Sequence, residues 1–120
     1  MSDYPTSFDS MLAAWNEPDP DKVRALLDEA LAPNVRFVDP SIDLTGIDAF
    51  AENVFHVQSQ IPGAVYSRTS GVDSQRGFHR YHWAIHHDGK LIQPGFDVAE
   101  TDESGRVVTV IGFFGEVPEL

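Results

Sequence analysis

The feature that most constrains the fold is a change of hydrophobic periodicity about halfway along the 120-residue chain. Up to about residue 62, apolar side chains mostly recur every three or four positions, which is typical of amphipathic helices. Beyond it they lie in extended runs separated by turn residues such as Asp88-Gly89. Helices gathered ahead of strands indicate an α+β protein and not a doubly wound parallel sheet.

Three helices and five strands are expected. The first helix follows Pro5-Thr6-Ser7, the second is capped by Asp19 with Pro20 in its first turn, and the third runs from Ile47 to Pro62-Gly63. The expected strands lie at 35–38, 65–72, 78–87, 91–99 and 107–114. Three helices on one face of a curved sheet would leave a cone-shaped pocket between the two layers.

Composition limits the classes of function. The chain carries 19 acidic against 8 basic residues, a formal net charge of −11, which argues against nucleic acid or an anionic membrane as a partner. It has no cysteine, and no apolar stretch long enough to span a membrane. The first six residues lack the pattern of a signal peptide. We therefore expect a cytoplasmic protein that forms a single domain over residues 1–120.

Two aspartates stand out by their apolar surroundings. Asp39 ends an apolar run just before Pro40, and Asp97 lies between Phe96 and Val98 in an expected strand. A carboxylate in such a strand is costly if it is desolvated and unpaired. If both face one apolar cavity, their pKa values can diverge, so that one serves as base and the other as acid.

Each aspartate also has a simpler interpretation. Asp39 can merely begin a turn, because aspartate favours turns through local hydrogen bonds. Asp97 can point outward to solvent, or pair with Arg80 or Arg106. The sequence leaves these alternatives open.

Four segments carry a family resemblance. They are Phe37-Val38-Asp39-Pro40, Thr45-Gly46, the stretch 96–107 and Gly112-Phe113-Phe114-Gly115-Glu116. Together with the order of elements, they resemble the nuclear transport factor 2-like superfamily, which includes SnoaL-like (polyketide-cyclase-like) proteins and ketosteroid isomerase. The resemblance implies a cystatin-like α+β barrel, with three helices packed on a curved antiparallel or mixed sheet that forms a cone-shaped pocket.

The resemblance also implies roles for the aspartates. In ketosteroid isomerase, an aspartate in a similar Asp-Pro context is the general base, which assigns that role to Asp39. A second aspartate on a late strand stays protonated and stabilises the enolate oxygen, which assigns that role to Asp97. The family's third group is a tyrosine on the first helix, near Met11 in this chain, where no tyrosine is present and Tyr4 comes too early.

The family register implies which residues line the pocket. With Asp97 facing inward, the strand at 78–87 presents His79, Tyr81, Trp83 and Ile85, and the last strand presents Gly112 and its neighbours two positions away. Tyr81 can either replace the missing tyrosine as a donor or be a core residue with its hydroxyl satisfied. The expected substrate-binding residues are Trp15, Phe37, Val54, Tyr81, Trp83, Gly95, Val110 and Phe114.

The histidines do not form a convincing metal site. His82 and His86 share one strand face, whereas His79 and His87 share the other, and a metal needs ligands that converge. His56 can lie near the pocket or on the surface. No phosphate-binding loop or nucleophile elbow is present. We expect neither a metal nor a cofactor.

Two functional hypotheses and one for assembly follow. The first is a cofactor-independent acid/base enzyme of the isomerase or cyclase/dehydratase type, in which Asp39 and Asp97 act on a small hydrophobic molecule. The second is a module that binds such a ligand, or another subunit, without turnover. For assembly, Phe96, Val98, Ile111 and Phe113 form an apolar set on the opposite sheet face, which predicts a homodimer.

Overall fold

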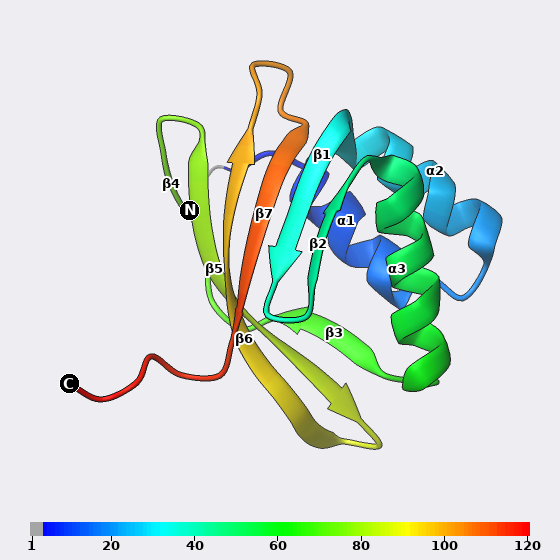
Figure 1. The fold of residues 1–120 in the computed structure, drawn as a ribbon, viewed down its shortest axis with the longest axis vertical. Coiled ribbons are helices and arrows are strands. Elements are labelled where there is room, and N and C mark those ends of the chain that lie inside the picture. The colour runs from blue at the N-terminus through cyan, green and yellow to red at the C-terminus, as the bar shows by residue number, and fades with distance from the viewer. Residues whose placement is uncertain (1–3) are drawn as a thin grey trace.

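The computed structural model describes residues 4–120 and places three helices against one face of a curved sheet (Figure 1). The helices are α1 (Ser7–Asn16), α2 (Pro20–Ala30) and α3 (Ile47–Gln60). The strands are β1 (Leu31–Asp39), β2 (Ile42–Thr45), β3 (Val65–Arg68), β4 (Asp73–Gln75), β5 (Phe78–His87), β6 (Lys90–Thr101) and β7 (Val107–Phe114).

The sheet is mixed and has the strand order β2-β1-β7-β6-β5-β3, with β4 paired to β5 beside β3. Every pairing is antiparallel except that of β1 with β7. The long strands β5 and β6 bend below the helical layer (Figure 1). This topology brings β1, which precedes α3, next to the last strand of the chain.

The helices form where the sequence supplies an apolar face and a start signal. Helix α1 buries Phe8, Met11 and Ala14, at the three-residue spacing that places side chains on one face. Helix α2 begins after Asp19, whose side chain accepts a hydrogen bond from the backbone N–H of Asp21. Helix α3 has Gly46 at its N-cap with a φ of 98°, a conformation that favours glycine.

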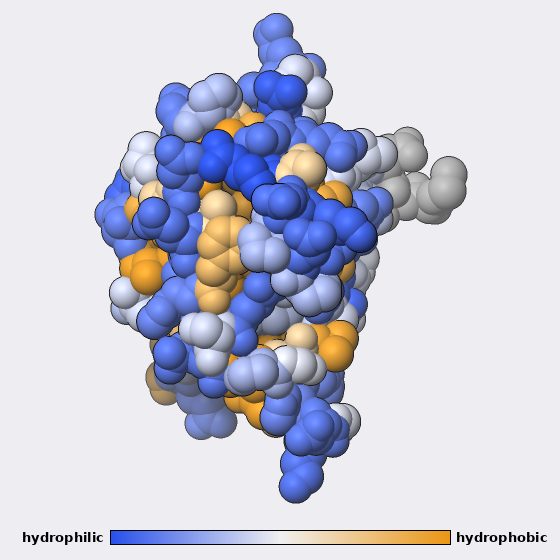
Figure 2. Space-filling model, turned by 90° about the vertical axis from the view of Figure 1, so that its right-hand side faces the viewer, coloured by the Kyte–Doolittle hydropathy of each residue, from blue (hydrophilic) through white to orange (hydrophobic). Residues whose placement is uncertain are grey.

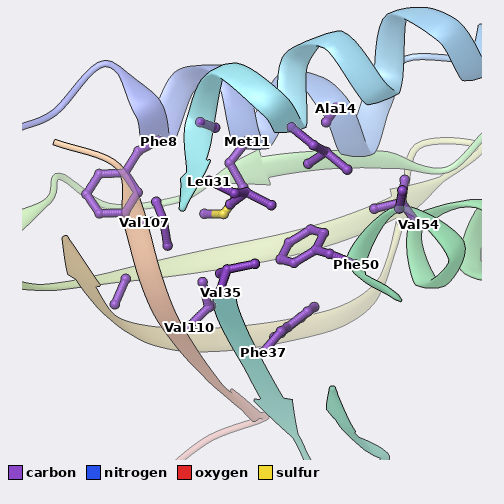
Figure 3. Close-up of a cluster of buried hydrophobic side chains, with 14 of the residues drawn as sticks. Phe8, Met11, Ala14, Leu31, Val35, Phe37, Phe50, Val54, Val107 and Val110 are labelled. Carbon is purple, nitrogen blue, oxygen red and sulfur yellow. The ribbon is translucent and has the colours of Figure 1, made fainter. Parts of the chain in front are cut away.

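The core lies between the helical layer and the inner face of the sheet. Figure 3 shows side chains from α1, α3 and the strands β1 and β7 meeting there, among them Phe8, Phe50, Val35 and Val107. The outer side of α2 and α3 is mainly hydrophilic, as Figure 2 shows. In the described part of the chain, no helix combines the length and apolar character that crossing a bilayer requires.

The expected fold class is confirmed: three helices pack on a mixed, curved sheet. The strands at 78–87 and 107–114 have their expected bounds, and Asp88 and Gly89 both adopt positive φ in the hairpin turn between β5 and β6. The strand predicted at 65–72 is wrong beyond residue 68, because the pairing with β5 stops there and resumes only in β4 at Asp73.

Other differences lie at strand ends. Strand β1 starts at Leu31, four residues before its expected start, and its pairing with β7 shifts register between Leu31 and Arg36. Strand β2 was not expected, because four residues are too few to establish a strand pattern in the sequence. It pairs with β1 in an antiparallel hairpin, and the two strands are joined by the turn at residues 40–41.

Candidate active site

A cavity of about 180 Å³ opens between the helices and the inner face of the sheet. Its walls come from α1, α3 and the strands β1, β3, β5, β6 and β7. Most of the lining is apolar or aromatic, and the ionisable groups among the lining residues are Asp39, Asp97, Arg68 and the two tyrosines Tyr66 and Tyr81. A concave apolar site with a few polar groups is the usual form of a small-molecule site.

Asp97 faces the cavity from β6 and accepts two hydrogen bonds from aromatic side chains of β5. The Tyr81 hydroxyl donates to Oδ2 at 3.0 Å, and the Trp83 indole N–H donates to Oδ1 at 2.8 Å. Tyr81 is directly opposite Asp97 in the β5–β6 register, and Trp83 is two residues further along the same face. Asp97 therefore neither faces solvent nor pairs with an arginine.

Burial raises the pKa of Asp97 to about 6, from an ordinary value of 3.8. The hydrogen bonds from Trp83 and Tyr81 oppose this rise by stabilising the carboxylate, while the nearby negative charge of Asp39 adds to it. The pKa of Tyr81 lies well above 10, first because of burial and then because of the charge on Asp97. Asp97 thus titrates close to neutral pH, and its carboxylate is the main form at pH 7.

Asp39 and Asp97 meet over Gly112. In register, Asp97 is opposite Gly112 on β7, and β1 runs parallel along the other side of β7. A methyl group at Gly112 would lie 3.2 Å from Oδ1 of Asp97 and 3.4 Å from Cβ of Asp39. Because Gly112 carries no side chain, the two acidic residues can share one end of the cavity.

Asp39 also organises the turn after β1. Its Oδ1 accepts hydrogen bonds from the backbone N–H of Ser41 at 2.8 Å, the Ser41 hydroxyl at 2.9 Å and the backbone N–H of Ile42 at 3.1 Å. Its Oδ2 accepts none from residues 4–120. The turn and the cavity are therefore not alternatives for Asp39, because one oxygen serves the turn while the residue lines the cavity.

This architecture recurs in known structures, although no family model matches the sequence and no curated protein sequence matches it. A protein from Agrobacterium tumefaciens, described as a candidate isomerase of the SnoaL-like family, is 31% identical, with a TM-score of 0.87 over 92% of this chain and 96% of its own. The chain belongs to the SnoaL-like family.

More distant structural neighbours share the fold alone. An NTF2-like protein of unknown function from Exiguobacterium is 19% identical, with a TM-score of 0.75 over 93% of this chain and 100% of its own. A protein from Jannaschia, described as a candidate SnoaL-like polyketide cyclase, is 16% identical, with a TM-score of 0.68 over 95% of this chain and 89% of its own.

The SnoaL-like cavity contains most of the expected site residues. Asp39, Asp97 and five of the eight expected substrate-binding residues line it; those five are Trp15, Phe37, Tyr81, Trp83 and Phe114. Phe37 and Trp15 pack edge to face with ring centroids 6.2 Å apart, and Trp83 meets Phe114 at 5.7 Å. Of the two roles considered for Tyr81, the structure matches the second, because it is a core residue whose hydroxyl is satisfied by donating to Asp97.

The structure places the other three expected substrate-binding residues outside the lining. Val54 on α3 is 0% exposed, and Val110 on β7 is 2% exposed. Both side chains pack within the hydrophobic core (Figure 3). Gly95 is covered by the Trp83 ring, which occupies the space where a side chain at this position would lie. The absence of a side chain at Gly95 therefore makes room for the Trp83 ring, and no space for a ligand remains at this position.

Two ionisable lining residues on β3, Tyr66 and Arg68, were not predicted from the sequence. The Arg68 guanidinium donates from Nη2 to the Tyr4 hydroxyl at 2.7 Å and to Oδ1 of Asp9 at 2.8 Å. The two residues are separated by one position on a strand, so they share a face, and this spacing was the available signal. The contacts with Asp9 and Tyr4 link segments about 60 positions apart, which alternation alone does not reveal.

The histidines lie outside this cavity. His79 is 7% exposed and bridges the hydroxyls of Ser74 and Thr101, at 2.7 and 2.9 Å, and burial lowers its pKa. Within residues 4–120, no three histidine or acidic side chains are grouped so that they could hold a metal ion. His79 is therefore a neutral structural residue.

Proposed function

We propose that this SnoaL-like protein is a cofactor-independent acid/base enzyme that transfers protons on a small hydrophobic molecule, as in an isomerisation, cyclisation or dehydration. The observation that supports this most is the Asp97 carboxyl group in an apolar cavity, with a pKa of about 6 and with Asp39 beside it. A proton-transfer group is most effective when its pKa is near the working pH. The description of the Agrobacterium relative as a candidate isomerase agrees with the proposal.

In this proposal Asp97 is the proton-transfer group. Its carboxylate removes a proton from a carbon next to a carbonyl group, and the same proton returns to another atom of the ligand. The electrons of the broken C–H bond pass into the ligand as an enolate and are used again when the proton returns. This differs from the roles implied by family resemblance, because both Asp97 oxygens accept hydrogen bonds and the carboxylate is the main form at pH 7.

Tyr81 and Trp83 act as positioning residues. Their hydrogen bonds fix both oxygens of Asp97 and keep its pKa from rising further. Asp39 supplies a negative charge that favours the protonated form of Asp97, so it assists proton uptake. The apolar walls exclude water, which would otherwise compete for the proton.

Substitution of Asp97 tests the proposal. Compounds that raise the melting temperature would be screened for chemical change, and turnover of each hit would be compared between wild type and Asp97→Asn. We expect kcat to fall by about 10²-fold or more. The matched control is Asp73→Asn, which removes an exposed carboxylate paired with Arg80. Undiminished turnover in Asp97→Asn would refute the catalytic role.

A second candidate function is binding of the same class of ligand without turnover. Two observations favour it: helix α1 carries no tyrosine, and the polar partners of Asp97 already come from within the protein. A ligand that binds with high affinity but is recovered unchanged, in the presence of every compatible co-substrate tested, would support this alternative.

We also propose that two copies of the chain associate through the outer face of the sheet. Phe113 is 53% exposed and Ile111 is 37% exposed on β7. They pair in register with Phe96 and Val98 of β6, so the four residues form one continuous apolar area. Apolar areas of this kind commonly mark association surfaces.

A further inference from the structure

Two buried polar atoms beside the cavity lack a hydrogen-bond partner. They are the hydroxyl oxygen of Tyr66 and Nη1 of Arg68, and no group in residues 4–120 bonds to either. Both residues line the same cavity. Leaving a buried donor unpaired is unfavourable, so each such group calls for an explanation.

The two groups lie on one face of β3, opposite Ile85 and Trp83 of β5. Arg68 is held in place by its hydrogen bonds to Tyr4 and Asp9. Both are donated by Nη2, and Nη1 has no hydrogen-bond partner among residues 4–120. Tyr66 packs against Trp15, with ring centroids 5.2 Å apart. Hydrogen bonds thus position Arg68 and aromatic packing positions Tyr66, and neither depends on the unpaired atom of that side chain.

The charges around the cavity favour a neutral ligand over an anionic one. The Arg68 charge is already balanced by Asp9, 2.8 Å away, and the other ionised groups are Asp39 and Asp97. An anionic ligand would meet these two carboxylates in a site of low polarity. A neutral carbonyl oxygen can accept hydrogen bonds from Tyr66 and Arg68 without that repulsion.

The volume limits the size of the ligand. A cavity of about 150 Å³ holds a benzene molecule, whereas pockets for drug-sized ligands begin at about 300 Å³. At about 180 Å³, this cavity accepts a molecule of roughly one ring.

We propose that Tyr66 and Arg68 together bind the carbonyl oxygen of a neutral, mainly apolar ligand about one ring in size. The inference rests on the proposed function for its choice of cavity, and it adds the class and orientation of the ligand. Burial raises the pKa of Tyr66 to about 12, which keeps its hydroxyl protonated and available as a donor.

This orientation places the polar end of the ligand at β3 and leaves Asp97 to act on its carbon skeleton. When ionised, Asp97 only accepts hydrogen bonds, as it does from Tyr81 and Trp83, and it has no donor to offer to a ligand oxygen. Donors for a ligand oxygen must therefore come from elsewhere in the lining, and Tyr66 and Arg68 supply them. Because both donor atoms are buried, this binding mode requires a small movement of the two side chains when the ligand enters.

Tyr66→Phe tests the inference, with cyclohexanone and methylcyclohexane as probes whose dissociation constants are measured by ligand-observed NMR. We expect the variant to bind cyclohexanone about tenfold more weakly and methylcyclohexane no more weakly than wild type does. Because only binding is measured, this result is independent of whether Asp97 catalyses turnover. Equal changes for both probes, or no change for either, would overturn the inference.

Thermal unfolding without ligand separates a binding role from a structural one. An unpaired buried hydroxyl contributes no stability, so Tyr66→Phe should keep or raise the melting temperature. Tyr4→Phe is the matched control and should lower it, because its hydroxyl bonds to both Asp9 and Arg68. A melting temperature lowered in Tyr66→Phe as in Tyr4→Phe would mean that the hydroxyl is paired within the protein, contrary to the inference.

Arg68→Lys and a charged probe complete the test. The lysine keeps the charge beside Asp9 but removes the second guanidinium nitrogen, so cyclohexanone should bind several-fold more weakly. Wild type should bind cyclohexanone more tightly than cyclohexanecarboxylate. Tighter binding of the carboxylate would contradict a neutral ligand and indicate an organic anion.

Discussion

Gly112 and Asp97 are register partners on β7 and β6, and the missing side chain at Gly112 leaves space for the Asp97 carboxyl group beside Asp39. The pairing joins two features that lie 15 positions apart in the sequence, a glycine in a strand and an acid in an apolar run. Strand glycines often mark places where another group approaches closely. Here the approaching groups are two acidic side chains.

Gly112→Ala should therefore impair the site more than the fold. The new methyl group would lie 3.2 Å from Oδ1 of Asp97, closer than most carbon contacts, while the backbone angle at Gly112 lies outside the positive φ region. We expect about tenfold weaker ligand binding and a melting temperature within a few degrees of wild type. Gly71→Ala is the control, since no atom lies within 4 Å of its methyl position. Equal binding by both variants would contradict the arrangement.

Removing the indole donor should raise the pKa of Asp97 further. In Trp83→Phe, Oδ1 loses the hydrogen bond that is the larger of the two stabilising the carboxylate. The carboxyl-carbon NMR titration of Asp97 should then shift to higher pH than in wild type. Trp15→Phe is the matched control, because Trp15 lines the cavity without bonding to Asp97. A downward shift in Trp83→Phe would be inconsistent with the hydrogen bond.

The raised pKa of Asp97 also predicts how stability depends on pH. Between about 4 and 6 the native state holds a proton that the unfolded state has released, so the free energy of unfolding falls as the pH rises. This single group contributes at most about 3 kcal/mol, all of it lost above the native pKa. Urea unfolding at a series of pH values should show a smaller fall in Asp97→Asn than in wild type. Identical pH profiles would exclude a raised pKa.

Association through the outer sheet face predicts a specific effect of charge. Phe113→Glu places a carboxylate in the apolar area formed by β6 and β7 and should convert the dimer to a monomer at micromolar concentration. Sedimentation velocity measures this directly. Val117→Glu adds the same charge at a 91% exposed position after β7 and should leave the dimer intact. A wild-type protein that sediments only as a monomer would rule out the association.

The sequence predicted the elements that have a long and well-bounded pattern. Strands β5 and β7 were located to the residue, because each is an extended run rich in aromatic or β-branched residues that lies between turn residues. The short strands β2 and β4 were missed, since three or four residues around polar side chains give no period. Their pairing is set by the neighbouring long strands.

The candidate site was also predictable in part. Alternation and family resemblance placed Asp39, Asp97, Tyr81 and Trp83 on the inner face. The donor roles of Tyr81 and Trp83 depend on the register between β5 and β6, which the sequence does not state. Arg68 depends on helix α1, which supplies Asp9 from about 60 residues away.

The most direct test of the central claim is the ionisation of Asp97 itself. Carboxyl-carbon NMR of the protein labelled at aspartate would follow each side chain through pH 3 to 9, with Asp97→Asn identifying the signal. A midpoint near 6 for this one residue is the result we predict. A midpoint near 3.8, the value of an ordinary solvated aspartate, would contradict both its burial in the cavity and its proposed role in proton transfer.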